Sequence, residues 1–130
     1  MTHNVRHQHL IVRAEINKPP GAEDCDFLVQ WMAQLIEKIE MKVMYGPVAK
    51  YCPVAGNRGM TGFAVIETSH CAFHAWDELD TALLEFDVYT CSNLNVQDVL
   101  DELQVFEPIK IEYKFLDREH GLKLVSEQVA

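Results

Sequence analysis

Apolar and polar residues alternate along several stretches of the chain, and this alternation predicts strands. In residues 8–16 the even-numbered positions from Leu10 to Ile16 are apolar, whereas the odd-numbered positions from His9 to Glu15 are mostly polar. A strand places successive side chains on opposite faces, so this pattern indicates a strand with one buried face. Further strands are predicted over residues 41–52, 60–76, 82–91 and 109–115.

Two other stretches have apolar residues at helical spacing. Residues 23–40 carry an apolar stripe from Phe27 to Ile39, and residues 95–105 carry a shorter one behind Asn95, a candidate N-cap. Strands that follow one another without an intervening helix favour antiparallel pairing. The sequence therefore predicts a single domain over residues 1–130 with an α+β fold, a two-layer sandwich with a mostly antiparallel sheet and both helices on one face. The uncovered sheet face invites dimerisation.

Composition and charge exclude some classes of function. The formal net charge of −9 and the lack of clustered Lys and Arg argue against nucleic-acid binding, which needs basic side chains against phosphates. No apolar run approaches the roughly 20 residues that span a bilayer, and the first nine residues are mostly polar, with no apolar signal core. The four cysteines form no CxxC pair, which favours reduced thiols. We therefore expect a cytoplasmic protein without a membrane contact.

Residues 59–92 hold most of the chemically reactive side chains, and the simplest interpretation of them is a sheet whose polar residues face solvent. One residue fits that interpretation poorly. Cys91 alternates in step with Glu85 and Asp87 and out of step with the apolar positions, whereas a structural cysteine is usually buried among apolar groups.

Two further interpretations of the same region involve chemistry. The first is a metal site, although no spacing matches a known zinc pattern and a third ligand must be chosen by hand. Its candidate ligands are His70, His74, Cys91 and Asp87, with His7 and His9 as another pair. The second is nucleophilic chemistry that uses Ser69, His74 and Cys91.

Three runs in this region form a composite motif. They are Thr61–His70 (TGFAVIETSH), His74–Glu78 (HAWDE) and Asp87–Cys91 (DVYTC), and a first strand containing His-Leu-Ile followed by an amphipathic helix precedes them. This order resembles the prokaryotic S-adenosylmethionine decarboxylase family, which carries Ser-Gly, Glu-Ser-His, His-Thr-Trp-Pro-Glu and Asp-Val-Phe-Thr-Cys. The resemblance covers nearly the whole chain.

The resemblance implies that the chain cuts itself between Thr68 and Ser69. Ser69 attacks the carbonyl of Thr68, an ester forms, and elimination followed by loss of ammonia converts Ser69 into a pyruvoyl group, which is the implied cofactor. Its carbonyl forms a Schiff base with the amine of S-adenosylmethionine and withdraws electrons from the breaking Cα–carboxylate bond. The implied product supplies aminopropyl groups for spermidine synthesis, and the implied assembly is a homodimer of cleaved protomers.

The resemblance also assigns three residues to proton transfer and to assistance of self-cleavage. His74 transfers a proton during self-cleavage, Thr61 assists the same step, and Cys91 donates a proton to the product carbon. Ser69 and His74 are five residues apart, so on one regular strand they face opposite ways. For both to serve one cavity, the chain must bulge or turn between them, and a smooth strand over residues 66–76 would count against this mechanism.

The remaining implied roles concern substrate binding. Glu78 aligns with a glutamate that binds the ribose hydroxyls, and Tyr51 or Phe63 supplies an aromatic ring for adenine. The chain departs from the family pattern at Thr68, where glutamate is usual, and at Asp77, where proline is usual. Two alternatives stay open: a pyruvoyl enzyme for arginine or ornithine, and a non-processing homologue that binds a ligand or a partner.

Overall fold

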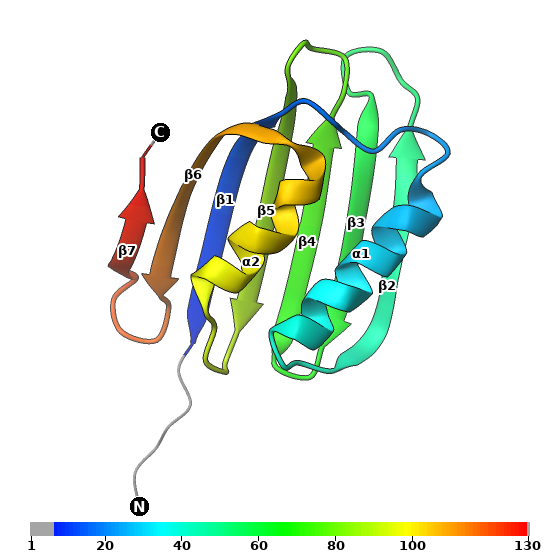
Figure 1. Cartoon of the computed structure of the whole chain (residues 1–130). Coiled ribbons are helices and arrows are strands. Elements are labelled where there is room, and N and C mark those ends of the chain that lie inside the picture. The colour runs from blue at the N-terminus through cyan, green and yellow to red at the C-terminus, as the bar shows by residue number, and fades with distance from the viewer. Residues whose placement is uncertain (1–6, 130) are drawn as a thin grey trace, which may run out of the picture.

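The computed structural model describes residues 7–129, and the strands in this part of the chain form one antiparallel sheet. Its order is β2-β3-β4-β5-β1-β6-β7. The strands are β1 (Gln8–Ile16), β2 (Val43–Cys52), β3 (Gly59–Ile66), β4 (Ser69–Trp76), β5 (Ala82–Thr90), β6 (Pro108–Asp117) and β7 (Lys123–Gln128). The helices α1 (Cys25–Lys38) and α2 (Val96–Glu102) lie on the same sheet face, and the 3₁₀ turn η1 (Leu103–Phe106) continues α2 (Figure 1). The predicted two-layer α+β fold is confirmed.

Helix α1 covers the β2–β4 side of the sheet with its apolar stripe. Its buried residues are Leu28, Trp31, Met32, Leu35 and Ile36, the positions that helical spacing predicts. The helix approaches β3 closely at Gly62, where an added Cβ would lie 2.8 Å from Leu28 Cδ2. Glycine at this position therefore sets the depth at which α1 packs.

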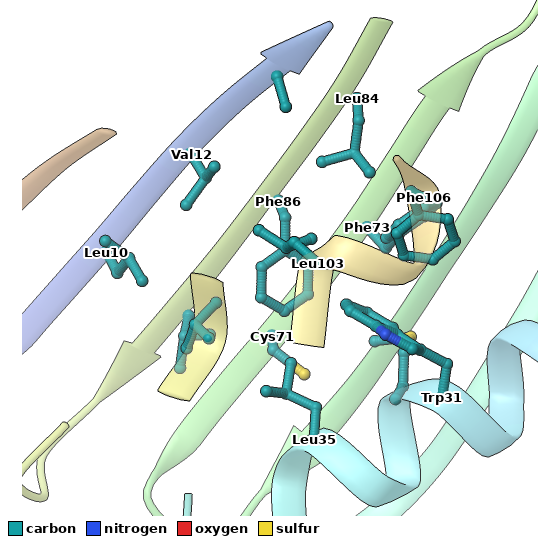
Figure 2. Packing of buried hydrophobic residues seen from close by; sticks show 14 of the residues in the cluster. Leu10, Val12, Trp31, Leu35, Cys71, Phe73, Leu84, Phe86, Leu103 and Phe106 are labelled. Atoms are coloured by element: carbon teal, nitrogen blue, oxygen red, sulfur yellow. The ribbon is translucent and has the colours of Figure 1, made fainter. Parts of the chain in front are cut away.

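Aromatic rings fill the centre of the core between the two layers. Trp31 points from α1 toward Phe73 of β4, Phe86 of β5 and Phe106 of η1, with ring centroids 5.6, 5.4 and 5.1 Å away. Figure 2 shows these rings together with the neighbouring aliphatic side chains of β1 and β5. The indole N–H donates a hydrogen bond to the carbonyl of Glu102, 2.8 Å away, and so ties α1 to the end of α2.

Neither helix covers the opposite face of the sheet, which we call the open face. On the central strands it carries the alternate positions that the core does not use, including Ile11, Arg13, Ala72, His74 and Asp87. These side chains are half-buried or exposed and include both signs of charge. The open face is therefore a mixed polar surface that contains the residues of chemical interest.

Three details of the sequence prediction are corrected by the structure. The strand predicted over residues 60–76 is two strands, because the chain turns at Glu67–Thr68 and pairs β4 back on β3. The strand β7 was not predicted, since its residues are all exposed and show no apolar alternation. The second helix is shorter than residues 95–105, because its last turn tightens into η1.

Candidate functional site

The turn between β3 and β4 presents the predicted cleavage junction at the lower end of the sheet (Figure 1). The backbone N–H of Cys91, just after β5, donates a hydrogen bond to the carbonyl oxygen of Thr68, 2.9 Å away. This carbonyl is the one that Ser69 would attack, and a donor aimed at it stabilises negative charge on the oxygen. The fold thus brings three predicted residues together: Thr68, Ser69 and Cys91.

The same junction is strained. Ser69 has a backbone φ of 147°, which lies in the region that favours glycine. The hydroxyl oxygen of Thr68 is buried and has no hydrogen-bond partner among the described residues. Each of these features costs on the order of 1–3 kcal/mol, so the intact Thr68–Ser69 peptide is a destabilised ground state.

The other predicted pair lies on the open face. Thr61 of β3 is directly opposite His74 of β4, and the Thr61 hydroxyl oxygen is 3.2 Å from His74 Nδ1. The imidazole also stacks on the indole of Trp76, with ring centroids 5.9 Å apart. These two contacts fix the orientation of the imidazole.

The structure does not bring Ser69 and His74 of one chain together. β4 pairs with both neighbouring strands without a register shift from Ser69 to Trp76, so the expected bulge or turn between Ser69 and His74 is absent and that prediction is wrong. Five steps of a regular strand separate the two residues by about 17 Å. His74 lies on the open face, whereas Ser69 occupies a register position of the helix-covered face.

The open face is hollowed beside His74. His9, Arg13, Glu85 and Asp87 contribute to the wall of this shallow hollow, together with His74 itself. His9 Nε2 lies 2.8 Å from an Asp87 carboxylate oxygen. The small side chain of Ala72 lies between His70 and His74 on the same face, and side chains of both charge signs surround the depression.

The predicted substrate-binding residues lie elsewhere on the sheet. Glu78 is in the loop after β4, at the upper end in Figure 1, about 23 Å or more along the strand direction from Ser69. Phe63 is exposed on the open face beside Ala72. Tyr51 pairs with Met60 and so lies on the helix-covered face. Tyr51 and Phe63 therefore cannot stack on one ring within a single chain.

Sequence reasoning missed a polar network at this upper end. Asp77 accepts hydrogen bonds from Arg58 Nε at 2.7 Å and from the Tyr51 hydroxyl at 2.6 Å. Both backbone N–H groups that reach Glu78 come from the loop before β3, at Gly56 and Arg58. No spacing rule links residues this far apart in the sequence, and the only signal was a carboxylate pair, Asp77 and Glu78, directly after a strand.

The alternative metal interpretation gains no geometric support. Within residues 7–129, no three His, Cys, Asp or Glu side chains are arranged so that they could hold a metal ion. Burial raises the pKa of the Cys71 thiol to about 12, so this cysteine stays protonated and is a packing residue of the core. No helix in the described range is long and apolar enough to cross a membrane.

Comparisons with known proteins agree with these features. A family model described as S-adenosylmethionine decarboxylase matches residues 8–119. A proenzyme of that name from Methanococcus maripaludis (strain C5) is 38% identical over 72 residues, covering 54% of this chain and 56% of the relative. One from Picrophilus torridus is 30% identical over 67 residues, covering 50% of each. The chain spans about half the length of the curated relatives it matches.

A solved structure agrees with the fold over nearly the full length. The adenosylmethionine decarboxylase from Aquifex aeolicus superposes with a TM-score of 0.65 and 18% sequence identity, covering 97% of this chain and 98% of that one. At this identity the similarity establishes the architecture of the sheet and helices.

Proposed function

The chain belongs to the S-adenosylmethionine decarboxylase family, and from that premise we propose that it cuts itself between Thr68 and Ser69 and then decarboxylates S-adenosylmethionine. The product would supply aminopropyl groups for spermidine synthesis. The observation that carries the proposal is the hydrogen bond from the Cys91 backbone N–H to the Thr68 carbonyl, at a junction with left-handed backbone at Ser69. We also place the protein in the cytoplasm, which agrees with four cysteine thiols that form no disulfide.

Self-cleavage begins with addition of the Ser69 hydroxyl oxygen to the carbonyl carbon of Thr68. Negative charge builds on the carbonyl oxygen, which already accepts the Cys91 N–H, and collapse of the adduct breaks the C–N bond to leave an ester. Loss of the Ser69 α-proton then expels the Thr68 carboxylate and leaves a dehydroalanine at position 69. Water adds to the α-carbon of this residue, and its amino nitrogen leaves as ammonia. Relief of the strain at Ser69 and Thr68 favours the forward direction.

The residues at this turn also fit the mature prosthetic group. A pyruvoyl group at position 69 would supply a carbonyl that condenses with the substrate amine and draws electrons from the breaking bond to the carboxylate. The hydrogen bond from the Cys91 backbone N–H to the Thr68 carbonyl keeps Cys91 next to this position, and its side chain is half-buried. Its thiol would hold the proton that is donated to the product carbon.

We further propose that a second copy of the chain completes the site. Thr61 and His74 cannot reach Ser69 of their own chain, since about 17 Å of regular strand separates them. A two-fold axis through the open face near Ala72 exchanges the ends of β4, because residue 72 is midway between 69 and 74. This axis places the end of β4 that carries His74 in the partner opposite the end of β4 that carries Ser69 in the first chain. The two sheets would be packed face to face, about 10 Å apart.

The open face has the composition that such a contact needs. Ile11 and Phe63 expose 44% and 42% of their surface there, which provides apolar area at the centre and at one side. Arg13 lies among the carboxylates of Glu15, Glu85 and Glu112, so charges of both signs are available for pairing across the two-fold axis. The hollow beside His74 provides a cavity between the two sheets.

Intact-mass spectrometry of the purified protein tests the proposal. We expect two chains, residues 1–68 and a chain that starts at position 69 with a pyruvoyl group, and turnover of S-adenosylmethionine in preference to arginine and ornithine. The Ser69→Ala variant should remain a single full-length chain, whereas the control Ser126→Ala, on the exposed strand β7, should be cut like the wild type. A wild-type protein that stays uncut after long incubation would refute the proposal. Preferred turnover of arginine or ornithine would refute the substrate assignment alone.

A further inference from the structure

Hydrogen bonds tie the loop of residues 53–58, and Tyr51 of β2, to the end of β4. Trp76 Nε1 donates to the side-chain oxygen of Asn57 at 2.9 Å. The carboxylates of Asp77 and Glu78 accept four more, which come from Tyr51, Arg58 and the backbone of the loop. The cleavage junction does not use this network, which lies at the opposite end of the sheet from Ser69, whereas Trp76 of the network also stacks on His74.

Asp77 is the centre of the network. One carboxylate oxygen accepts the Tyr51 hydroxyl at 2.6 Å and the other accepts Arg58 Nε at 2.7 Å, while the side chain is only 13% exposed. Partial desolvation raises the pKa of this carboxyl, but the hydrogen bonds from Arg58 and Tyr51 outweigh that effect and lower the pKa overall. Asp77 is therefore an ionised carboxylate that fixes two side chains from β2 and from the 53–58 loop.

Glu78 depends on that loop for its own orientation. Its Oε2 accepts the backbone N–H of Gly56 at 3.0 Å and its Oε1 accepts the backbone N–H of Arg58 at 2.9 Å. These two hydrogen bonds lower the pKa of Glu78. A carboxylate has about four acceptor sites, so each oxygen keeps one for a ligand. The carboxylate is exposed, ionised and held in one orientation, which suits two neighbouring hydroxyl groups.

We propose that Asp77 is a positioning residue: through Arg58 and Tyr51 it holds the 53–58 loop so that the loop fixes the Glu78 carboxylate for the vicinal hydroxyls of a nucleoside. This inference rests on the proposed function, because it assigns the ribose of the substrate to Glu78, contributed by the second copy of the chain together with His74. Tyr51 then acts on the substrate through Asp77 and the loop, and the phenol itself does not stack on adenine. That role agrees with its place on the helix-covered face of the sheet.

Binding of adenosine and of 2′-deoxyadenosine, measured by calorimetry, tests this arrangement because the two probes differ by one hydroxyl. A hydrogen bond to a charged group contributes about 1.5–3 kcal/mol, so the wild type should prefer adenosine by about tenfold or more. Asp77→Asn should reduce this preference to less than about threefold. In mature enzyme it should raise KM for S-adenosylmethionine and leave kcat and self-cleavage nearly unchanged.

Asp101→Asn is the matched control, since it weakens a surface hydrogen bond of similar length, from Gln97 Nε2 at 2.7 Å, on the distant helix α2. Its probe preference and KM should equal those of the wild type. Tyr51→Phe removes the hydrogen bond from the Tyr51 hydroxyl to Asp77 and should also reduce the preference for adenosine over 2′-deoxyadenosine. This second variant tests the same role if Asp77→Asn does not fold.

The outcomes separate the two proposals. A wild type that turns over S-adenosylmethionine and prefers adenosine, together with variants that keep the full preference, overturns the positioning role and leaves the proposed function standing. A wild type that turns over S-adenosylmethionine but binds both probes equally overturns the assignment of Glu78 to the hydroxyls. A wild type without turnover overturns the proposed function, and the positioning role with it.

Discussion

Two inactive variants of this chain should restore each other if His74 of one copy serves Ser69 of another. Within one chain the two residues are about 17 Å apart along β4 and on opposite faces of the sheet. A proton transfer needs heavy atoms within about 3 Å, or one bridging water. The gap is several times that reach, and β4 is regular between the two residues, so no side-chain rotation closes it.

The perturbation is co-expression of Ser69→Ala and His74→Ala chains that carry different tags. Random pairing makes about half of the dimers mixed. In a mixed dimer the His74→Ala chain keeps its own Ser69 and meets an intact His74 on its partner, whereas the second site lacks both residues. We therefore expect about half of the His74→Ala chains to be cut and all Ser69→Ala chains to stay whole.

Intact-mass spectrometry reads each tagged chain separately, and each variant expressed alone gives the baseline. The control pair is Ser69→Ala with Thr61→Ala, since Thr61 lies beside His74 and belongs to the same half of the site. In this pair about half of the Thr61→Ala chains should be cut, and all Ser69→Ala chains should stay whole. Efficient cleavage of His74→Ala expressed alone would refute a role for His74, and the absence of any cut chain in the mixed dimers would refute the shared site.

Two further predictions concern stability. Phe73→Ala removes a ring that is fully buried among the core aromatics and should lower the free energy of unfolding by about 3–5 kcal/mol, measured by urea titration; Phe27→Ala, which is 45% exposed, should cost less than half as much, and an equal cost would contradict the assigned core. The folded-state pKa of Asp77 is lowered, so its contribution to stability is complete above the unfolded value near 3.9 and is lost as the pH falls through the folded value. The melting temperature of Asp77→Asn should therefore fall less than that of the wild type between about pH 5 and pH 2, and parallel curves would contradict the ion pair.

The fold was largely predictable because most elements have a single buried face. The stripe on α1 and the alternation on β1 and β5 each report one side in contact with the core. β7 gives no such signal, because both of its faces are exposed and, within residues 7–129, β6 is its one neighbouring strand. The hairpin of β3 and β4 was read as one strand, since its turn at Glu67–Thr68 contains neither glycine nor proline.

The network around Asp77 shows a second reason for a missed feature. Tyr51, Arg58 and Asp77 come from three different segments, and their contact depends on two loops that meet at the same end of the sheet. The pattern of apolar and polar residues within one element indicates which face a residue occupies, but it carries no information on which loops become neighbours. Only the strand order β2-β3-β4-β5 puts the loop before β3 beside the loop after β4.

The spacing of Ser69 and His74 along the sequence bears directly on how the site can be assembled. A strand reverses side-chain direction at every residue, so an odd separation within one unbroken strand assigns two residues to opposite faces. The structure shows β4 unbroken from Ser69 to Trp76, and this removes every single-chain route between the pair. A chain that needs both residues at one reaction centre must then take the second from another copy. The regular strand that counts against the mechanism in one chain is thus an argument for an assembly in which a second copy brings its His74 to the Ser69 end of the first.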